Sequence, residues 1–184
     1  MNKKAFVPSG ISTLRLVALP LFLYFFANGA TAGCIVVFGF AQLTDLVDGY
    51  VARKLGVASK FGAYFDAATD FVLVTGIFVA FTLSNYYPAW ILLLIVASFT
   101  QFIVTSRFHK KLYDPLGKYI GSVLYLAIGL TLLSPTAPVF LLVEVGFSVF
   151  AVASFVTRTV SLSARYKRNL LIRREMQRIK LHSA

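Results

Sequence analysis

The sequence predicts an all-α integral membrane protein with six transmembrane helices, both termini in the cytoplasm, and a basic C-terminal amphipathic helix. Three observations lead to this prediction. The 184 residues are 58% hydrophobic, with a mean hydropathy of +0.78, which is more apolar than soluble domains are. The apolar residues form six long segments, and most of the 18 Lys and Arg residues flank those segments.

The six segments lie near residues 11–29, 31–54, 60–84, 87–107, 115–134 and 137–163. Each can cross a hydrocarbon layer about 30 Å thick, which takes about twenty helical residues. Helices are required because lipid cannot satisfy an open strand edge. Lys3 and Lys4, with the apolar run after them, imitate a signal peptide, but Arg15 and Pro20 interrupt that run. The first segment is therefore predicted to be a transmembrane helix and not a cleaved leader.

The connections between the segments alternate in charge. Residues 28–33, 84–88 and 134–138 carry none, whereas the opposite connections and the tail are rich in Lys and Arg. The positive-inside rule then predicts a multi-pass protein of the cytoplasmic membrane. The net charge of +11 is explained by contact with anionic lipid headgroups and not with nucleic acid, because the chain has no soluble segment left over that could form a nucleic-acid-binding domain.

The chain is expected to divide into a membrane domain, residues 1–164, and a basic cytoplasmic tail, residues 165–184. The tail carries seven Lys or Arg among the sixteen residues 165–180, interleaved with Leu, Ile and Met. Such a pattern is typical of an amphipathic helix lying on anionic headgroups. A frayed, solvated tail is the alternative.

Four of the seven acidic residues lie in otherwise apolar runs: Asp45, Asp48, Asp66 and Asp70. Each pair shares one face of its helix, and the two pairs come to a similar depth, about 9–15 Å inside the cytoplasmic boundary. Four carboxylates without cations would repel one another, and only Arg53 is expected nearby to neutralise them. The pattern predicts a cup for two hard divalent cations, a pair suited to phosphoryl chemistry. Pairing of each acid with Arg or Lys is the alternative.

Three small residues accompany the acids: Gly49, Ala52 and Gly62. They would let a nucleotide or pyrophosphate approach the backbone, or they serve ordinary small-residue helix packing. Arg53 would either reach a phosphate or be a plain positive-inside flank.

The spacing D-x2-D-G-x2-A-R-x8-G-x3-D-x3-D is matched without a gap by Asp45, Asp48, Gly49, Ala52, Arg53, Gly62, Asp66 and Asp70. This pattern resembles the signature of the CDP-alcohol phosphotransferases, the class I CDP-alcohol phosphatidyltransferase family. The length and six-helix plan resemble its small prokaryotic members.

The resemblance implies an enzyme that binds two Mg²⁺ or Mn²⁺ ions. Asp45 and Asp48 would hold the first ion, Asp66 would bridge, and Asp70 would help to hold the second ion and take the proton from an acceptor alcohol. That alcohol would attack CDP-diacylglycerol, or its archaeal ether equivalent CDP-archaeol, and CMP would leave. The site would open to the cytoplasm, and the relatives commonly form homodimers.

The residues expected to contact the CDP-linked lipid are Gly49, Ala52, Arg53, Ser59, Gly62 and Ser12. Ser12 belongs to Ser9-x-x-Ser12-x-x-Arg15, which resembles an N-terminal N-x-x-T-x-x-R element with Ser at both polar positions. The resemblance implies that this element lines the nucleotide pocket, and the two Ser residues imply a weaker contact.

The acceptor is a polar alcohol, and a phosphorylated one such as glycerol 3-phosphate or inositol phosphate would need cations. Arg107, Lys118 and Arg158 are the candidates because they lie at span edges, although positive-inside flanking explains each equally well. Phe71 follows Asp70, where many glycerophosphate-using relatives have Lys. An intramembrane divalent-cation carrier is the alternative function, but the outer half of the third segment is almost wholly apolar. Glu144 has no assigned role.

Overall fold

Six helices and no strand make up the part of the chain that the computed structural model describes, residues 6–54, 60–108 and 119–182. Side chains are described from residue 14 onward, except at 45–46, 48–53, 60–64, 102, 104–108, 161–162 and 164–182. The helices are α1 (Phe6–Ala27), α2 (Thr31–Lys54), α3 (Lys60–Leu83), α4 (Trp90–Phe108), α5 (Ile120–Leu133) and α6 (Ala137–His182). The all-α prediction is confirmed for these residues.

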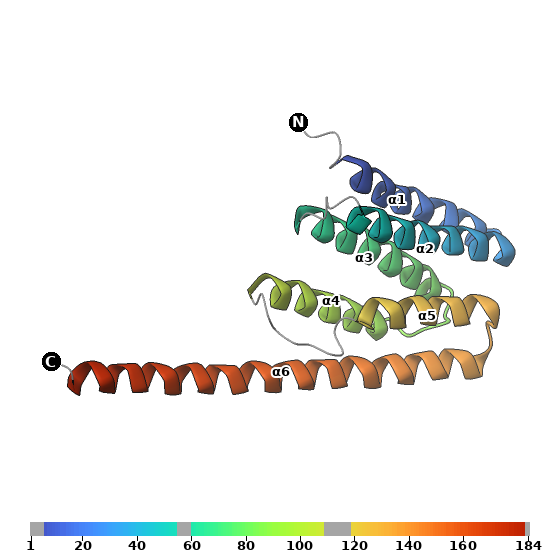
Figure 1. The fold of residues 1–184 in the computed structure, drawn as a ribbon. Helices are drawn as coiled ribbons and strands as arrows, with labels where there is room; N and C mark the ends of the chain where they lie inside the picture. The colour runs from blue at the N-terminus through green and yellow to red at the C-terminus, as the bar shows by residue number, and fades with distance from the viewer. Residues whose placement is uncertain (1–5, 55–59, 109–118, 183–184) are drawn as a thin grey trace.

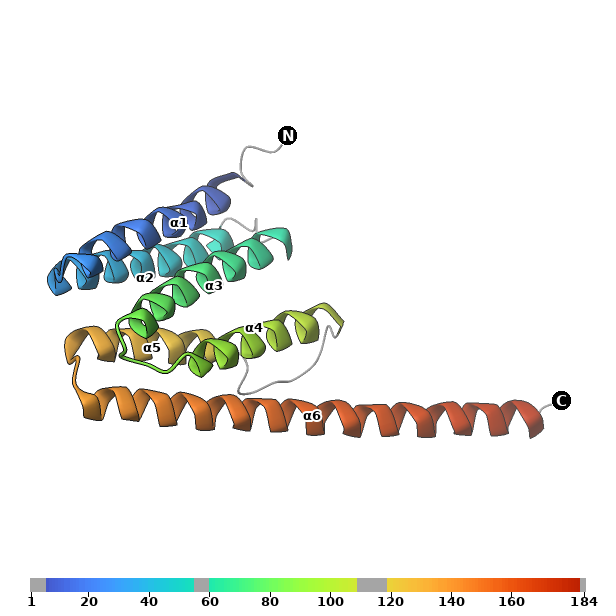
Figure 2. The same cartoon turned by 180° about the vertical axis from the view of Figure 1, so that it is seen from behind.

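Successive helices run back and forth, so that the start of α1 and the end of α6 lie at the same end of the bundle (Figures 1 and 2). The connections after α1, α3 and α5 lie together at the opposite end. These three connections are the uncharged ones, as expected if one end of the bundle faces away from the cytoplasm. The side of the membrane on which each end lies stays a prediction.

The predicted boundaries at charged residues agree with the structure. α2 covers the predicted range 31–54 and ends at Lys54, and α3 begins at the predicted Lys60 and ends one residue before the predicted 84. α1 begins five residues before the predicted start at 11, and α4 begins three residues after the predicted start at 87. The predicted start of the fifth segment, at 115, lies outside the described residues.

The tail is helical, as predicted, but it is not a separate helix. α6 continues without interruption from Ala137 to His182, a run of 46 residues, and it projects beyond the other five helices (Figure 1). At 1.5 Å per residue such a helix is about 69 Å long. The apolar stretch of α6 ends at Val160, close to the predicted end of the sixth segment at 163, but the helix itself continues through the tail.

Two apolar stretches are long enough to cross a membrane within the described ranges, Phe65–Leu83 and Ala137–Val160. Four shorter apolar helical stretches accompany them, so the number of spans stays a prediction: Leu14–Ala27, Thr31–Thr44, Trp90–Gln101 and Ile120–Leu133. Large apolar side chains are widely exposed on the bundle surface; Val36 is 70% exposed and Leu93 is 72% exposed. Such a surface is typical of a protein in contact with lipid.

α3 lies at the centre of the bundle, packed against α1, α4 and α5, while α6 packs on α4 and α5. Aromatic rings fill the core near the uncharged connections. Phe22 and Phe26 of α1 meet Phe81 of α3, and Tyr86 stacks on Phe140 of α6 with ring centroids 4.7 Å apart. Ring packing therefore stabilises this end of the bundle. Asp66 and Asp70 lie near the start of α3, at the opposite end.

The contact between α1 and α3 depends on a glycine. A Cβ atom added at Gly76 would lie 2.7 Å from Leu19 Cδ1, closer than side chains approach one another. We expect Gly76→Val to push the two helices apart and to destabilise the protein by about 1–3 kcal/mol. Gly129→Val on α5 is the matched control, because a Cβ there meets no heavy atom within 4 Å. Thermal unfolding in detergent gives the stability of both variants, and an equal loss of stability in the two would contradict the prediction.

Candidate functional site

Two of the predicted aspartates share one partner. Arg15 Nη1 on α1 lies 2.9 Å from Asp66 Oδ1 on α3, and the same nitrogen donates a hydrogen bond to Asp70 Oδ1. The Arg15 side chain is 1% exposed, whereas those of Asp66 and Asp70 are 38% and 27% exposed. A buried guanidinium thus holds two partly accessible carboxylates together.

Helical periodicity brings these three groups together. Asp66 and Asp70 are four residues apart on α3 and therefore lie on one face. Arg15, Ala18 and Phe22 follow the spacing i, i+3, i+7 on α1, and all three are buried. The close approach of Leu19 to Gly76 keeps α1 against α3, so the buried stripe of α1 carries Arg15 onto the acidic face of α3.

The cation beside these acids was missed in the sequence. Arg53 was expected to be the only neutralising residue, but Arg15 performs this role for Asp66 and Asp70. The signal was present, because an arginine inside an apolar segment has to find an anion. Arg15 had been interpreted only as an interruption of the first segment and as the end of a weakly matching element.

Most other predicted site residues lack described side chains. The backbone places Asp45, Asp48, Gly49, Ala52 and Arg53 in α2, Gly62 in α3, Ser12 in α1 and Arg107 in α4. Ser59 and Lys118 lie outside the described residues altogether. The four-carboxylate cup therefore stays a prediction. Among the side chains that are described, no group of three or more His, Cys, Asp or Glu could hold a metal ion.

Arg158 is the one acceptor candidate whose side chain is described. It is 2% exposed, in the part of α6 that packs against the bundle. Ser154, one turn earlier on the same helix face, is 1% exposed, and its buried Oγ has no hydrogen-bond partner within the described part of the chain. Arg158 lies two residues before the end of the apolar stretch Ala137–Val160, and its side chain is buried in the bundle; its role in acceptor binding stays a prediction.

The acidic pair fits a divalent cation. Asp66 Oδ1 and Asp70 Oδ1 both face a single positive group, the Arg15 Nη1 atom. Carboxylate oxygens are the ligands that Mg²⁺ and Mn²⁺ prefer. The two carboxylates are also accessible to solvent in part, as an ion that enters from water requires.

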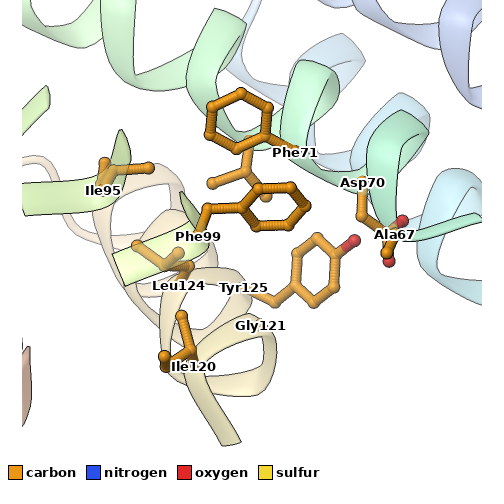
Figure 3. A pocket seen from close by; sticks show the side chains of 10 residues that line it. Ala67, Asp70, Phe71, Ile95, Phe99, Ile120, Gly121, Leu124 and Tyr125 are labelled. Carbon is orange, nitrogen blue, oxygen red and sulfur yellow. The ribbon is translucent and has the colours of Figure 1, made fainter. Parts of the chain in front are cut away.

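An apolar pocket of about 180 Å³ lies beside Asp70, between α3, α4 and α5 (Figure 3). Phe71 and Phe99 stack in its wall with ring centroids 4.2 Å apart. Asp70 and Tyr125 are the polar side chains among its described lining residues, and Figure 3 shows both on the same side of the pocket. The remaining lining residues are Ala67, Val74, Ile95, Ile120, Gly121 and Leu124. An acidic group therefore stands at the edge of a space suited to hydrocarbon.

Comparison with known families decides the assignment. The sequence model described as CDP-alcohol phosphatidyltransferase matches residues 5–158, most of the chain. The chain belongs to the CDP-alcohol phosphatidyltransferase family. The match extends from α1, which carries Arg15, to Arg158 on α6, and so includes every predicted site residue.

Individual relatives of this phosphatidyltransferase share about 30% of their residues with it, over part of the chain. The chain is 29% identical over 115 residues to a CDP-diacylglycerol–glycerol-3-phosphate 3-phosphatidyltransferase of Yersinia enterocolitica, which is 61% of this chain and 62% of the relative. It is 31% identical over 93 residues to a candidate cardiolipin synthase of Mycobacterium tuberculosis, which is 50% of this chain and 44% of the relative. The matched region thus spans less than two thirds of either relative.

Proposed function

We propose that this protein transfers a phosphatidyl-type group from a CDP-linked lipid to an alcohol, with release of CMP. The observation that carries the proposal is the convergence of Asp66 and Asp70 on one cationic position, next to an apolar pocket. Membership of the CDP-alcohol phosphatidyltransferase family and the names of the relatives support the same reaction.

Asp70 would act as the general base. An alcohol is a weak nucleophile, so a carboxylate within hydrogen-bond reach has to accept its proton. The alcohol oxygen then forms a bond to the lipid-side phosphorus, the bond from that phosphorus to the CMP oxygen breaks, and CMP leaves with the electron pair. Asp70 is suited to this role because it is 27% exposed and lies at the pocket edge.

Asp45, Asp48, Asp66 and Asp70 would hold two divalent cations, Mg²⁺ or Mn²⁺. When bound, these ions would stabilise negative charge on the phosphate oxygens. Gly49, Ala52 and Gly62 would leave space for the nucleotide, and Arg53, Ser59 and Ser12 would contact it. The membrane domain would open this site to the cytoplasm. The polar headgroup of the CDP-linked lipid would lie there, and CMP would be released into it.

The apolar pocket would hold hydrocarbon of the CDP-linked lipid near the reacting phosphate. Apart from Asp70 and Tyr125 the described lining residues are apolar, and none of these residues carries a positive charge that could bind a phosphate. Hydrocarbon gains about 25 cal/mol per Å² on leaving water, so a chain would occupy such a space readily.

A larger side chain that fills this pocket tests whether the pocket binds lipid hydrocarbon. Gly121 lines the pocket, and a Cβ there meets no heavy atom within 4 Å. We expect Gly121→Leu to lower kcat/KM for a long-chain CDP-lipid by about tenfold, because one displaced hydrocarbon group is worth about 1–3 kcal/mol. Activity with a short-chain CDP-lipid should fall less. Gly129→Leu, on the same helix outside the pocket lining, is the matched control, and equal effects of the two variants would exclude the pocket from lipid binding.

Glycerol 3-phosphate is the first acceptor to consider, because the Yersinia relative is named for it. Buried Arg158, together with Arg107 and Lys118, would supply positive charge for its phosphate. Inositol phosphate would be recognised by the same chemistry.

A lipid alcohol such as phosphatidylglycerol is the second candidate acceptor. Phe71 stands directly after Asp70 and stacks on Phe99, so the described wall of the pocket beside the proposed base is aromatic. The mycobacterial relative, named as a candidate cardiolipin synthase, supports the same reading. The product would then be a cardiolipin-type lipid.

The proposal is tested with purified full-length protein, CDP-diacylglycerol and Mg²⁺ or Mn²⁺. Glycerol 3-phosphate, inositol phosphate, inositol, serine and phosphatidylglycerol are offered in turn, and CMP release and lipid product are measured. Product with one of these acceptors supports the transfer reaction and identifies its second substrate. Transport of Mn²⁺ into vesicles without any CMP release would instead support the cation carrier. The buried apolar residues of α3, among them Leu73, Ile77 and Phe81, disfavour an ion path along that helix.

A further inference from the structure

We propose that Arg15 and a bridging divalent cation compete for the same position between Asp66 and Asp70. Arg15 would then be a positioning residue that controls when the cation can bind. This inference rests on the proposed function, since it concerns the cation that the phosphatidyl transfer would use. The relevant observation is that one nitrogen atom, Arg15 Nη1, contacts both Oδ1 atoms.

The space between the two carboxylates admits one positive group. Arg15 Nη1 is 2.9 Å from Asp66 Oδ1 and also contacts Asp70 Oδ1. Mg²⁺ takes its oxygen ligands at about 2.0–2.1 Å, so an ion on both of these oxygen atoms would overlap Nη1. Two positive charges at this separation also repel strongly. Either the guanidinium or the ion can bridge Asp66 and Asp70, but not both.

Displacement of Arg15 is costly because of its burial. The side chain is 1% exposed, and a buried charge that loses its partner is strongly destabilising. A displaced guanidinium is therefore stabilised by an anion that arrives with the cation. The phosphate groups of a CDP-linked lipid are anions that would arrive at this position in the proposed reaction, and Arg binds phosphate well. Cation binding is therefore expected to be weak until the donor is present.

The test measures Mn²⁺ binding without nucleotide or lipid donor. Purified full-length protein in detergent is titrated with MnCl₂, and free Mn²⁺ is followed by electron paramagnetic resonance. Arg15→Gln removes the competing charge, so its affinity for Mn²⁺ should be at least about fivefold higher than that of the wild type. Changes of this size are typical when one bound group alters the affinity for another. Arg178→Gln removes one positive charge from the basic tail of α6 and is the matched control; its affinity should stay within about twofold of the wild type.

A second measurement separates competition from a structural role. Mn²⁺ should raise the Tm of Arg15→Gln by more than it raises the Tm of the wild type, because the ion replaces the lost partner of Asp66 and Asp70. If Arg15→Gln does not fold, Arg15→Lys serves instead; its single ammonium bridges two carboxylates less well, so Mn²⁺ should again bind more tightly than to the wild type.

The outcomes are distinguishable. Equal or weaker Mn²⁺ binding by the folded Arg15 variant overturns the competition and leaves the transfer reaction standing. An equal gain in Arg178→Gln overturns it too, because the effect would then be one of net charge. Absence of Mn²⁺ binding in every protein, with or without CDP, overturns the proposed cation site itself.

Discussion

Asp70→Asn is expected to lower CMP release from CDP-lipid by about 10³-fold. Its carboxylate is the proposed base, and positioned general bases contribute about 10²- to 10⁴-fold. An amide cannot accept the proton, and it is a poor ligand for a divalent cation. The measurement is initial-rate CMP release with saturating acceptor and Mg²⁺.

The variant should remain folded, which makes the loss interpretable. Arg15 keeps Asp66 as a partner at 2.9 Å when Asp70 becomes an amide. Glu144→Gln is the matched control, because Glu144 is another half-buried acid, placed in α6 and outside the proposed site. It should keep nearly full activity. Turnover by Asp70→Asn at the wild-type rate would remove Asp70 from the mechanism.

Much of the helical plan could be predicted because the signals that end each helix are local. Lys54 and Lys60 bracket the connection between α2 and α3, and both helix ends agree with the prediction. The continuity of α6 with the tail was not predicted, for a physical reason. The predicted segment ends where the apolar residues end, but no Gly or Pro follows Gly146, so nothing in the sequence stops the helix there.

The acidic face of α3 was also predictable, since the spacing of Asp66 and Asp70 fixes it. The need of Arg15 for an anion was readable too, but its pairing with these two carboxylates was not, because Arg15 is 55 residues from Asp70 in sequence. Spacing within one helix says nothing about which face of another helix packs against it. The decisive contact is tertiary: the stripe of Arg15, Ala18 and Phe22 is buried against α3, and periodicity alone does not choose its neighbour.

Removal of divalent cations is expected to abolish transfer without unfolding the protein. With EDTA, CMP release should fall by about 10³-fold or more, because charge on the phosphate oxygens would lose its main stabilisation. Mg²⁺ or Mn²⁺ should restore it. The fold should survive, because Arg15 can hold Asp66 and Asp70 together and thereby limit the repulsion between their carboxylates.

Thermal unfolding in EDTA checks that second expectation. The wild type should unfold cooperatively in EDTA, whereas Arg15→Gln should have a clearly lower Tm there and recover with Mn²⁺. Full transfer activity in EDTA would contradict the cation requirement. Loss of the wild-type fold in EDTA would show that the ion pair of Arg15 cannot replace a bound cation. The same ion would then be needed both for the stability of the acidic face and for its chemistry.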